Sequence, residues 1–324
     1  MPVPSFLKDP LIQGILVATV LAVLLPAHGG FADAFGVATK LAIALLFFLY
    51  GARLSTREAL RGLTHWRLHL VILAFTFMVY PLIGLALYPS TVVISEPLYQ
   101  GILYAMLVPS TVQSSVALTG IARGNVSGAV VAASLSSLVG VIATPVLVML
   151  LMGAGEGITV DSGVFLNIAL QLLLPFALGQ LAHNVLPRVR EIAGANATKL
   201  VDRGSIWMVV YSAFSQGMVS GVWGEVRAWE IAALAVFSFL LVYAMLGVTR
   251  VTADALHFSY TDRVAIQMCG TQKSLAAGLP MASVIFGGAS LGILIVPLMI
   301  YHLIQLMICS ALAARYAREA DATR

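Results

Sequence analysis

The sequence predicts an all-α membrane protein of ten transmembrane helices, built as two inverted five-helix repeats. Three observations predict this class: 60% of the 324 residues are hydrophobic, only 10% are charged, and the mean hydropathy is +0.97. Soluble domains carry about a quarter charged residues. Because so few charged side chains cannot cover the surface of a chain this long, we expect the lipid bilayer to surround it.

Ten apolar segments are long enough to cross the hydrocarbon core of a bilayer, which takes about 20 helical residues. The predicted spans are about 10–26, 34–52, 68–88, 98–122, 126–152, 163–185, 204–222, 229–249, 263–285 and 287–314. The first follows Lys8 and precedes "PAHGG", which also fits the pattern of a signal peptide. We interpret it as an uncleaved first helix because nine further spans follow.

The basic residues predict the orientation of these spans. Fifteen of the 18 gather on one side: Lys8, Arg53, Arg57, Arg61, Arg67, Arg123, Arg188, Arg190, Lys199, Arg203, Arg250, Arg263, Arg315, Arg318 and Arg324. The other side has Arg227 and, at a helix edge, Lys40, and the last is Lys273 within a span. Since basic loops stay in the cytoplasm, we predict that both termini are cytoplasmic, in a bacterial inner membrane. The net charge of +4 then reflects topology, and no nucleic-acid partner is expected.

The spans repeat at an offset near 160 residues. Their starts at 10, 34, 68, 98 and 126 return at 163, 204, 229, 263 and 287. Five is an odd number, so the second half must be inverted relative to the first, as in many secondary transporters. The repeat is clearest where "TVQSS" (111–115) matches "TQKSL" (271–275) through a shared Thr-x-x-Ser. We therefore predict a single domain over 1–324, with repeats at about 10–152 and 163–314.

The fourth span, "YAMLVPSTVQSSVALTG", is predicted to break near its centre. Pro109 has no N–H donor and disfavours helical backbone at Val108. The polar residues that follow are Ser110, Thr111, Gln113, Ser114 and Ser115. Packing between helices is the alternative role for such residues. We predict a functional site because the proline, the polar cluster and the repeat coincide.

The ninth span, "VAIQMCGTQKSLAAGLP", is predicted to break in the same way at Gly270. Its candidate site residues are Gln267, Met268 (through its carbonyl), Thr271, Gln272, Lys273 and Ser274. Both clusters fall near the membrane midplane, where irregular backbone is tolerated only along a cavity or inside protein. Two such breaks in inverted halves predict a binding site, with half-helix amino ends facing an anion and carboxyl ends facing a cation.

Four motifs carry a family resemblance: "FLYGARLS" (48–55), "PSTVQSSVALT" (109–119), "RGN" (123–125) and "CGTQKSLAAGLP" (269–280). With the ten-span plan, the chain resembles the bile acid:sodium symporter superfamily, in its SBF-like branch of bacterial relatives of solute carrier family 10 member 7. The resemblance implies a core of helices three to five and eight to ten, at about 68–152 and 229–314, where helices four and nine cross at the midplane. It also implies a panel at about 10–52 and 163–222, and alternating access by movement of one against the other.

The predicted site departs from this family at its sodium ligands. Sodium-coupled members carry "E-V-G-M-Q-N-S" on helix nine, and alignment on the shared Gly-x-Gln puts that Glu at Met268 and that Asn at Lys273. The family's Ser and Thr ligands on helix five fall at Ala129 and Ala133. The resemblance thus implies a sodium site that has lost its carboxylate and two hydroxyls and has gained a cation. No cofactor or metal is expected, and sodium is kept as an alternative.

Lys273 lies too far from either end of its span to reach the interface by snorkelling. In a first hypothesis its ammonium replaces bound sodium, donates to Gln113, Ser114, Ser115 and the broken-helix carbonyls, and couples transport to protons by releasing and regaining one. In a second hypothesis it binds an anionic substrate directly. In a third it is a structural charge that joins helices four and nine.

These observations predict a secondary active transporter of a small organic anion or amphipathic solute, coupled to protons or to no ion. The alternatives are a sodium-coupled bile-acid-type symporter and a regulator of ion homeostasis, although calcium would need carboxylates that are missing at membrane depth. A third alternative is an intramembrane enzyme with a Ser114–Lys273 dyad. We expect no enzyme, because there is no HExxH motif and no histidine beside the serine cluster. The expected partners are the solute and bilayer lipid, with a homodimer left open, and His302 is interpreted as a packed or interfacial residue.

Overall fold

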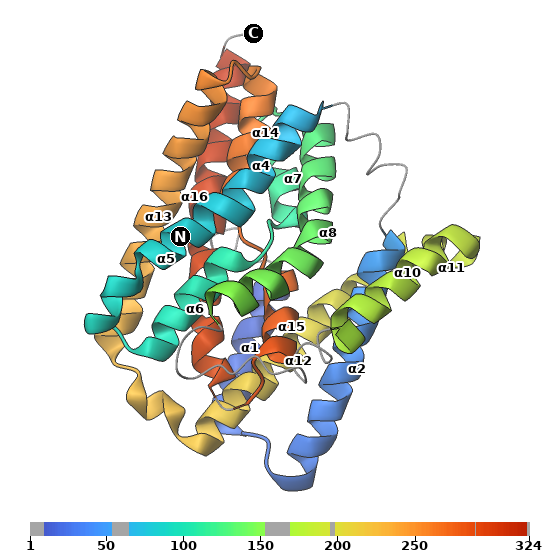
Figure 1. Cartoon of the computed structure of the whole chain (residues 1–324), viewed down its shortest axis with the longest axis vertical. Coiled ribbons are helices and arrows are strands. Elements are labelled where there is room, and N and C mark those ends of the chain that lie inside the picture. The colour runs from blue at the N-terminus through green and yellow to red at the C-terminus, as the bar shows by residue number, and fades with distance from the viewer. Residues whose placement is uncertain (1–9, 54–64, 153–168, 195–197, 289, 323–324) are drawn as a thin grey trace. The chain divides into compact units, whose positions relative to one another are not determined.

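The computed structural model describes residues 10–53, 65–152, 169–194, 198–288 and 290–322, and every regular element within them is helical (Figure 1). The predicted all-α membrane class is confirmed for this part of the chain. Five helices are long and apolar enough to cross a membrane, and a pair bent by 60° adds a sixth: Gly29–Arg53, Trp66–Val92, Val126–Leu151, Ala228–Ala255 and Leu291–Glu319, with Glu96–Leu107 and Val112–Ile121 as the pair.

The count of ten spans stays a prediction. The start expected at 163 lies outside the described residues, as do four residues used for the topology, Lys8, Arg57, Arg61 and Arg324.

The chain divides into two compact units that alternate along the sequence. Unit one comprises residues 1–56, 145–226 and 278–295, and unit two comprises residues 57–144, 227–277 and 296–324. The helices wholly within unit one are α1 (Pro10–Leu24), α2 (Gly29–Arg53), η5 (Ala169–Leu173), α10 (Leu174–Val185), α11 (Pro187–Gly194), α12 (Thr198–Ser220) and η6 (Val222–Glu225). Those wholly within unit two are α4 (Trp66–Ala74), η3 (Phe75–Val79), α5 (Tyr80–Ala86), η4 (Tyr88–Val92), α6 (Glu96–Leu107), α7 (Val112–Ile121), α13 (Ala228–Ala255) and α14 (Tyr260–Thr271). Three helices contribute residues to both units: α8 (Val126–Leu151), α15 (Leu275–Ile285) and α16 (Leu291–Ala322).

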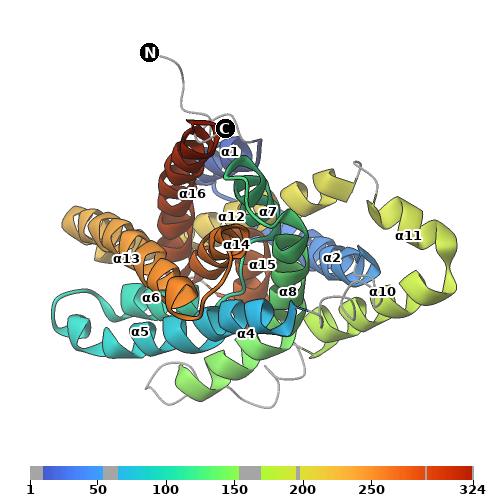
Figure 2. The same ribbon diagram turned by 90° about the horizontal axis from the view of Figure 1, so that it is seen from above.

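Unit one is organised around the close pair α2 and α10, which run side by side (Figures 1 and 2). A Cβ atom at Gly51 of α2 would collide with the Phe176 carbonyl, and one at Gly179 of α10 would collide with the Phe48 carbonyl. The two glycines therefore let the backbones touch, which is how membrane helices gain packing energy without a hydrophobic driving force. At the end of α2, the Arg53 guanidinium binds Asp202 of α12 at 2.7 Å.

Unit two places α14 among α4, α7 and α13 (Figure 2). A buried apolar cluster fills the contact between α4, α8, α13 and α14: Leu68, Ile72, Ala129, Ala132, Ala133, Ala253, Ala265, Ile266 and Cys269. Ala129 and Ala133 are the positions that the family resemblance aligned with hydroxyl ligands. Both are fully buried in this cluster.

Both predicted breaks are present in unit two. Helix α6 ends at Leu107, Val108 and Thr111 are extended, and α7 begins at Val112. Helix α14 ends at Thr271, Gln272 is extended, and α15 begins at Leu275. The prediction that Gly270 is the break is wrong by two residues, since Gly270 lies in the last turn of α14. Just after the end of the helix, the backbone of Lys273 is bound by Gln305 of α16.

Candidate functional site

The side chain of Lys273 ends at the break between α6 and α7. Its ammonium nitrogen Nζ donates to the carbonyls of Met106 at 2.7 Å, Val108 at 2.9 Å and Thr76 at 3.0 Å. The Nζ atom also lies 4.3 Å from the centroid of the Tyr80 ring, and the residue is 0% exposed. An ammonium has three N–H donors. All three are used, so the charge of Lys273 is bound entirely by backbone carbonyls and one aromatic face.

Each of these carbonyls lacks a donor in its own helix. Met106 and Val108 lie at the carboxyl end of α6, where the last carbonyls have no intrahelical partner and carry partial negative charge. Thr76 lies in the π-helical turn η3, where the Tyr80 N–H donates to Phe75, five residues back. The next N–H in that pattern would belong to residue 81, which is a proline without a donor. Pro81 therefore leaves the Thr76 carbonyl to the lysine.

The remaining polar backbone of the first break is satisfied by neutral groups. The Leu107 carbonyl accepts from Thr144 Oγ1 at 2.9 Å, and the Ser110 N–H donates to Ser136 Oγ at 3.0 Å. The Pro109 carbonyl accepts from the Ser274 N–H at 2.8 Å, which joins the two breaks through their backbones. Buried backbone groups need such partners at this depth.

The second break receives hydroxyl groups from the first. Ser110 Oγ donates to the Cys269 carbonyl at 2.6 Å, Thr111 Oγ1 to the Lys273 carbonyl at 2.8 Å, and Ser115 Oγ to the Met268 carbonyl at 3.2 Å. The polar cluster predicted in span four thus lies against the predicted residues of span nine. Ser115, which the first hypothesis makes an acceptor for the lysine ammonium, instead donates to a carbonyl of that span.

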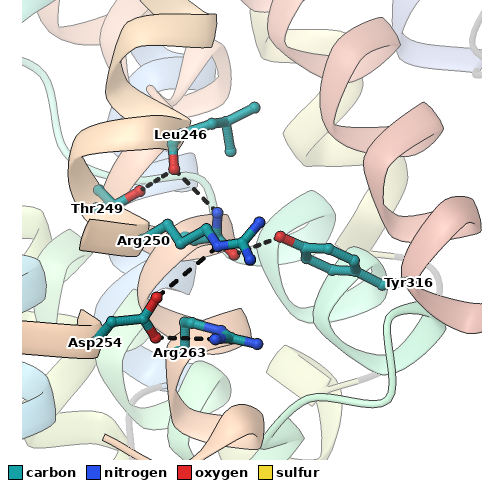
Figure 3. A network of polar contacts seen from close by, with 7 residues as sticks. Leu246, Thr249, Arg250, Asp254, Arg263 and Tyr316 are labelled. Carbon is teal, nitrogen blue, oxygen red and sulfur yellow. Dashed lines mark hydrogen bonds and ion pairs between the residues drawn. The ribbon is translucent and has the colours of Figure 1, made fainter. Parts of the chain in front are cut away.

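Two predicted site residues lie elsewhere. Gln113 is exposed, and Gln267 takes part in a separate network of α13, α14 and α16. In that network Gln267 Nε2 donates to the Leu246 carbonyl at 2.9 Å and Gln267 Oε1 accepts from the Tyr316 hydroxyl at 3.0 Å. Figure 3 shows Leu246 and Tyr316 there, beside ion pairs of Asp254 with arginines 250 and 263. Of the partners named in the first hypothesis, the ammonium binds broken-helix carbonyls and not Gln113, Ser114 or Ser115, because the carbonyls take all of its N–H groups.

The side chains of Thr271 and Gln272 are buried but not fully bonded. Ser114 Oγ donates to Gln272 Oε1. Thr271 Oγ1 has no hydrogen-bond partner in the described part of the chain, and Gln272 Nε2 has no oxygen or nitrogen partner there and faces the Cys309 thiol. Because a buried polar atom without a partner is costly, these two atoms are ones that could each take a further hydrogen bond.

Helix α16 supplies residues that the sequence analysis missed. Tyr301 and Tyr80 place their hydroxyls on the Thr271 carbonyl, at 2.9 and 2.6 Å. Gln305 binds the backbone of Lys273 at both its N–H and its carbonyl, at 2.7 and 2.8 Å, and His302 lies beside it. The available signal was polar residues at positions 301, 302 and 305 of an apolar span, at the spacing of one helical face.

No carboxylate accompanies these groups. The only acidic residues buried in the described structure are Asp202 and Glu230. The first pairs with Arg53, and the second accepts from the N–H groups of Arg227 and Ser95. Within the described residues, no group of three or more His, Cys, Asp or Glu side chains has the arrangement of a metal site. The one formal charge bound at the breaks is therefore that of Lys273.

Comparison with known proteins places the chain among transporters. Residues 9–318 match the model of the "SBF-like CPA transporter family". A protein of Pseudomonas aeruginosa, "Uncharacterized protein PA2026", is 45% identical over 98% of this chain and 96% of its own length. "Putative symporter YfeH" of Escherichia coli K12 is 41% identical over 97% of this chain and 94% of its own length. "Sodium/bile acid cotransporter 7" of Mus musculus is 30% identical over 94% of this chain and 91% of its own length.

Proposed function

The chain belongs to the SBF-like CPA transporter family, and from this premise we propose that it is a secondary active transporter of a small organic anion or amphipathic solute in which Lys273 is a built-in cation. The family match and the apolar helices make it an integral, multi-pass membrane protein. The proposal concerns the substrate class, the coupling ion and the mechanism of exchange across the membrane.

The contacts of Lys273 carry the proposal. A sodium ion at a broken helix would bind carbonyl oxygens at a helix carboxyl end together with a negative ligand. Here the carbonyls of Met106 and Val108 already bind a covalently attached positive charge. Met268 stands where sodium-coupled members of the resembling superfamily carry a carboxylate, and Ala129 and Ala133 stand where they carry hydroxyls. We infer that the cation function is intrinsic to the chain and that sodium is not required.

The same contacts argue against two other roles of Lys273. Its N–H groups are all taken, so it has no donor left for a substrate anion. We assign substrate recognition to Gln113, which is exposed, to Thr271 and Gln272, which each have a buried polar atom without an oxygen or nitrogen partner among the described residues, and to the half-buried Ser114 bonded to Gln272. A Ser–Lys catalytic dyad is disfavoured, because Ser114 donates to Gln272 while the lysine donates to carbonyls.

The expected architecture is part of the proposal. Ten spans in two inverted repeats would form a core and a panel, with both termini cytoplasmic in a bacterial inner membrane. The division into two compact units supports part of this, because unit one includes both expected panel segments and unit two includes residues 68–144, 229–277 and 296–314 of the expected core, whereas core residues 145–152 and 278–295 fall in unit one. Alternating access would then be a movement of one unit relative to the other, and pairing of two copies as a homodimer would be decided by light scattering of the purified protein.

Ion coupling is tested by thermal unfolding in detergent, with sodium replacing potassium, from pH 5 to 9. We expect wild type to unfold at the same temperature in both salts, because a ligand stabilises only a folded state that binds it. The double variant Met268→Glu/Lys273→Asn restores the superfamily pattern and should become more stable as sodium is added. The matched control is Lys40→Asn, which changes an exposed lysine. Sodium-dependent stabilisation of wild type would contradict this proposal and would favour sodium symport instead.

Transport itself is tested in proteoliposomes with a panel of amphipathic carboxylates and sulfonates. Uptake should be unchanged when sodium replaces potassium. An inward proton gradient should increase uptake if Lys273 exchanges its proton during the cycle, and should have no effect if it keeps it. The absence of uptake for every anion, together with uptake of an inorganic cation, would overturn the proposed substrate class.

A further inference from the structure

Gln305 on α16 holds the second break by a two-point contact with Lys273, which we call the Gln305 clamp. Its Oε1 accepts from the Lys273 N–H at 2.7 Å, and its Nε2 donates to the Lys273 carbonyl at 2.8 Å. Gln305 is fully buried. One amide side chain thus satisfies both backbone groups of the residue that carries the ammonium.

The orientation of this amide follows from the backbone. A main-chain N–H can only donate, and a main-chain carbonyl can only accept. An inverted Gln305 amide would place two donors face to face at the Lys273 N–H and two acceptors face to face at its carbonyl. The oxygen must therefore face the N–H, and the NH₂ group must face the carbonyl.

This orientation fixes the protonation of His302. Its Nδ1 lies 2.8 Å from Gln305 Nε2 and 3.3 Å from the Lys273 carbonyl. Because Gln305 Nε2 is a donor, Nδ1 must be the acceptor, so the ring is neutral and carries its proton on Nε2. The second N–H of the Gln305 amide is used in this bond.

We propose that His302 is a proton-binding switch whose protonation opens the Gln305 clamp and frees the N–H of Lys273. A proton on Nδ1 would face the Gln305 NH₂ group across 2.8 Å, where two donors repel. The new N–H can instead donate to the Lys273 carbonyl, displacing Gln305 Nε2 from it. The amide must then leave the lysine backbone, so the Lys273 N–H loses its acceptor Gln305 Oε1, while the Lys273 carbonyl keeps donors in His302 and Thr111.

The titratable groups around His302 come from three elements. Lys273 in the break is bound through its backbone, and its ammonium points to the carbonyls of Thr76, Met106 and Val108. Tyr80 of α5 and Tyr301 of α16 bind the Thr271 carbonyl and each other. Cys309 is also buried on α16. Of these groups, the imidazole is the one whose ordinary titration falls in the physiological range.

The proposal deepens the proposed function, since it names a proton site of the transporter, but it is tested without a substrate. Hydrogen–deuterium exchange of the purified protein in lipid nanodiscs is followed by mass spectrometry at pH 8 and pH 5.5. Rates are corrected for the intrinsic pH dependence of amide exchange. In wild type, we expect protection of the peptide containing residues 272–274 to fall at least tenfold at the lower pH.

Variants separate the switch from other causes. His302→Asn keeps an acceptor beside Gln305 but cannot bind a proton, so the segment should stay protected at both pH values; His302→Gln is the second variant of the same kind. Gln305→Ala should leave the segment exchanging fast at both. His183→Asn is the matched control, because His183 lies in unit one, with its Nδ1 at the Ala52 carbonyl.

The outcomes distinguish this proposal from the function on which it rests. A pH response that persists in both His302 variants and disappears in Lys273→Met would assign the proton to the lysine and overturn the switch, while the transporter proposal would stand. Equal protection of wild type at the two pH values would also overturn the switch. Failure of the proposed function would be seen separately, as an absence of uptake in proteoliposomes by a protein whose exchange still responds to pH.

Discussion

The two broken helices of unit two use different chemistry to solve the same problem. At the α6–α7 break, the carbonyls of Met106 and Val108 bind a full positive charge. At the α14–α15 break, the carbonyls of Met268, Cys269 and Thr271 bind neutral hydroxyl groups. Each break also draws its donors from the other, because Lys273 serves the first and the Ser110–Ser115 segment serves the second. The two halves of the chain thus each have a broken helix, but only the break between α6 and α7 binds a cation, the ammonium of Lys273.

The largest effect should follow removal of the charge at the first break. Lys273→Met keeps an apolar chain of similar length but leaves three buried carbonyls without a donor. We expect a loss of about 3 kcal/mol or more in the free energy of unfolding, because each buried acceptor left unsatisfied costs about 1–3 kcal/mol. The free energy of unfolding is measured by titrating a strong detergent into mixed micelles, and Lys40→Met, at an exposed lysine, is the control. A loss within experimental error of that control would mean that the ammonium is not needed at the first break.

A smaller effect should follow removal of one hydroxyl at the second break. Ser110→Ala leaves the Cys269 carbonyl without its donor, and neutral hydrogen bonds contribute less than charged ones. We expect a loss of about 1–2 kcal/mol in the same unfolding measurement. Ser127→Ala, which changes an exposed serine, serves as the control and should be nearly neutral. A loss as large as that of Lys273→Met would remove the contrast between the two breaks.

The smallest effect should come from Pro81→Ala, which adds a backbone N–H near one of the three carbonyls that bind the lysine ammonium. An alanine N–H at this position can continue the π-helical turn and donate to the Thr76 carbonyl. Alone, the change should alter the free energy of unfolding by about 1 kcal/mol or less. Combined with Lys273→Met, it should recover about 0.5–1.5 kcal/mol, since the two residues serve the same acceptor. Strict additivity of the two changes would show that Pro81 does not create the need for the lysine.

Much of this arrangement follows from local sequence rules. Pro109 predicts the first break, and the shared Thr-x-x-Ser places the second at the matching position. The meeting of the 110–115 segment with residues 268–274 was also predicted, because both clusters lie at the same membrane depth. The exact end of α14 was not predicted. Gly270 permits a break, but the residue just beyond the helix end, Lys273, is bound by Gln305, which lies 32 residues further along the chain.

The partners of Lys273 were harder to predict for a physical reason. The predicted breaks indicate main-chain carbonyls as a class of partner for the ammonium, but every residue has such a carbonyl, so the sequence does not say which of them bind it. Only the loss of an N–H at Pro81 and at Pro109 hints at which carbonyls become available. The role of Tyr301, His302 and Gln305 was missed because a few polar residues in an apolar helix are equally compatible with simple packing.

The covalent attachment of the cation has a thermodynamic consequence for the proposed transporter. A bound sodium ion is released on the far side of the membrane and so delivers the free energy of its gradient, whereas the charge of Lys273 returns with the protein in every cycle. The highest accumulation ratio of the solute is then set by its own charge in the membrane potential and by any proton that moves with it. A pH difference of one unit across the membrane supplies about 1.36 kcal/mol per proton, which equals a tenfold concentration ratio. One proton per cycle would therefore let that pH difference raise the accumulation ratio of the solute by at most about a factor of ten. For such a protein, the accumulation of solute would increase with external acidity and would not depend on the external sodium concentration.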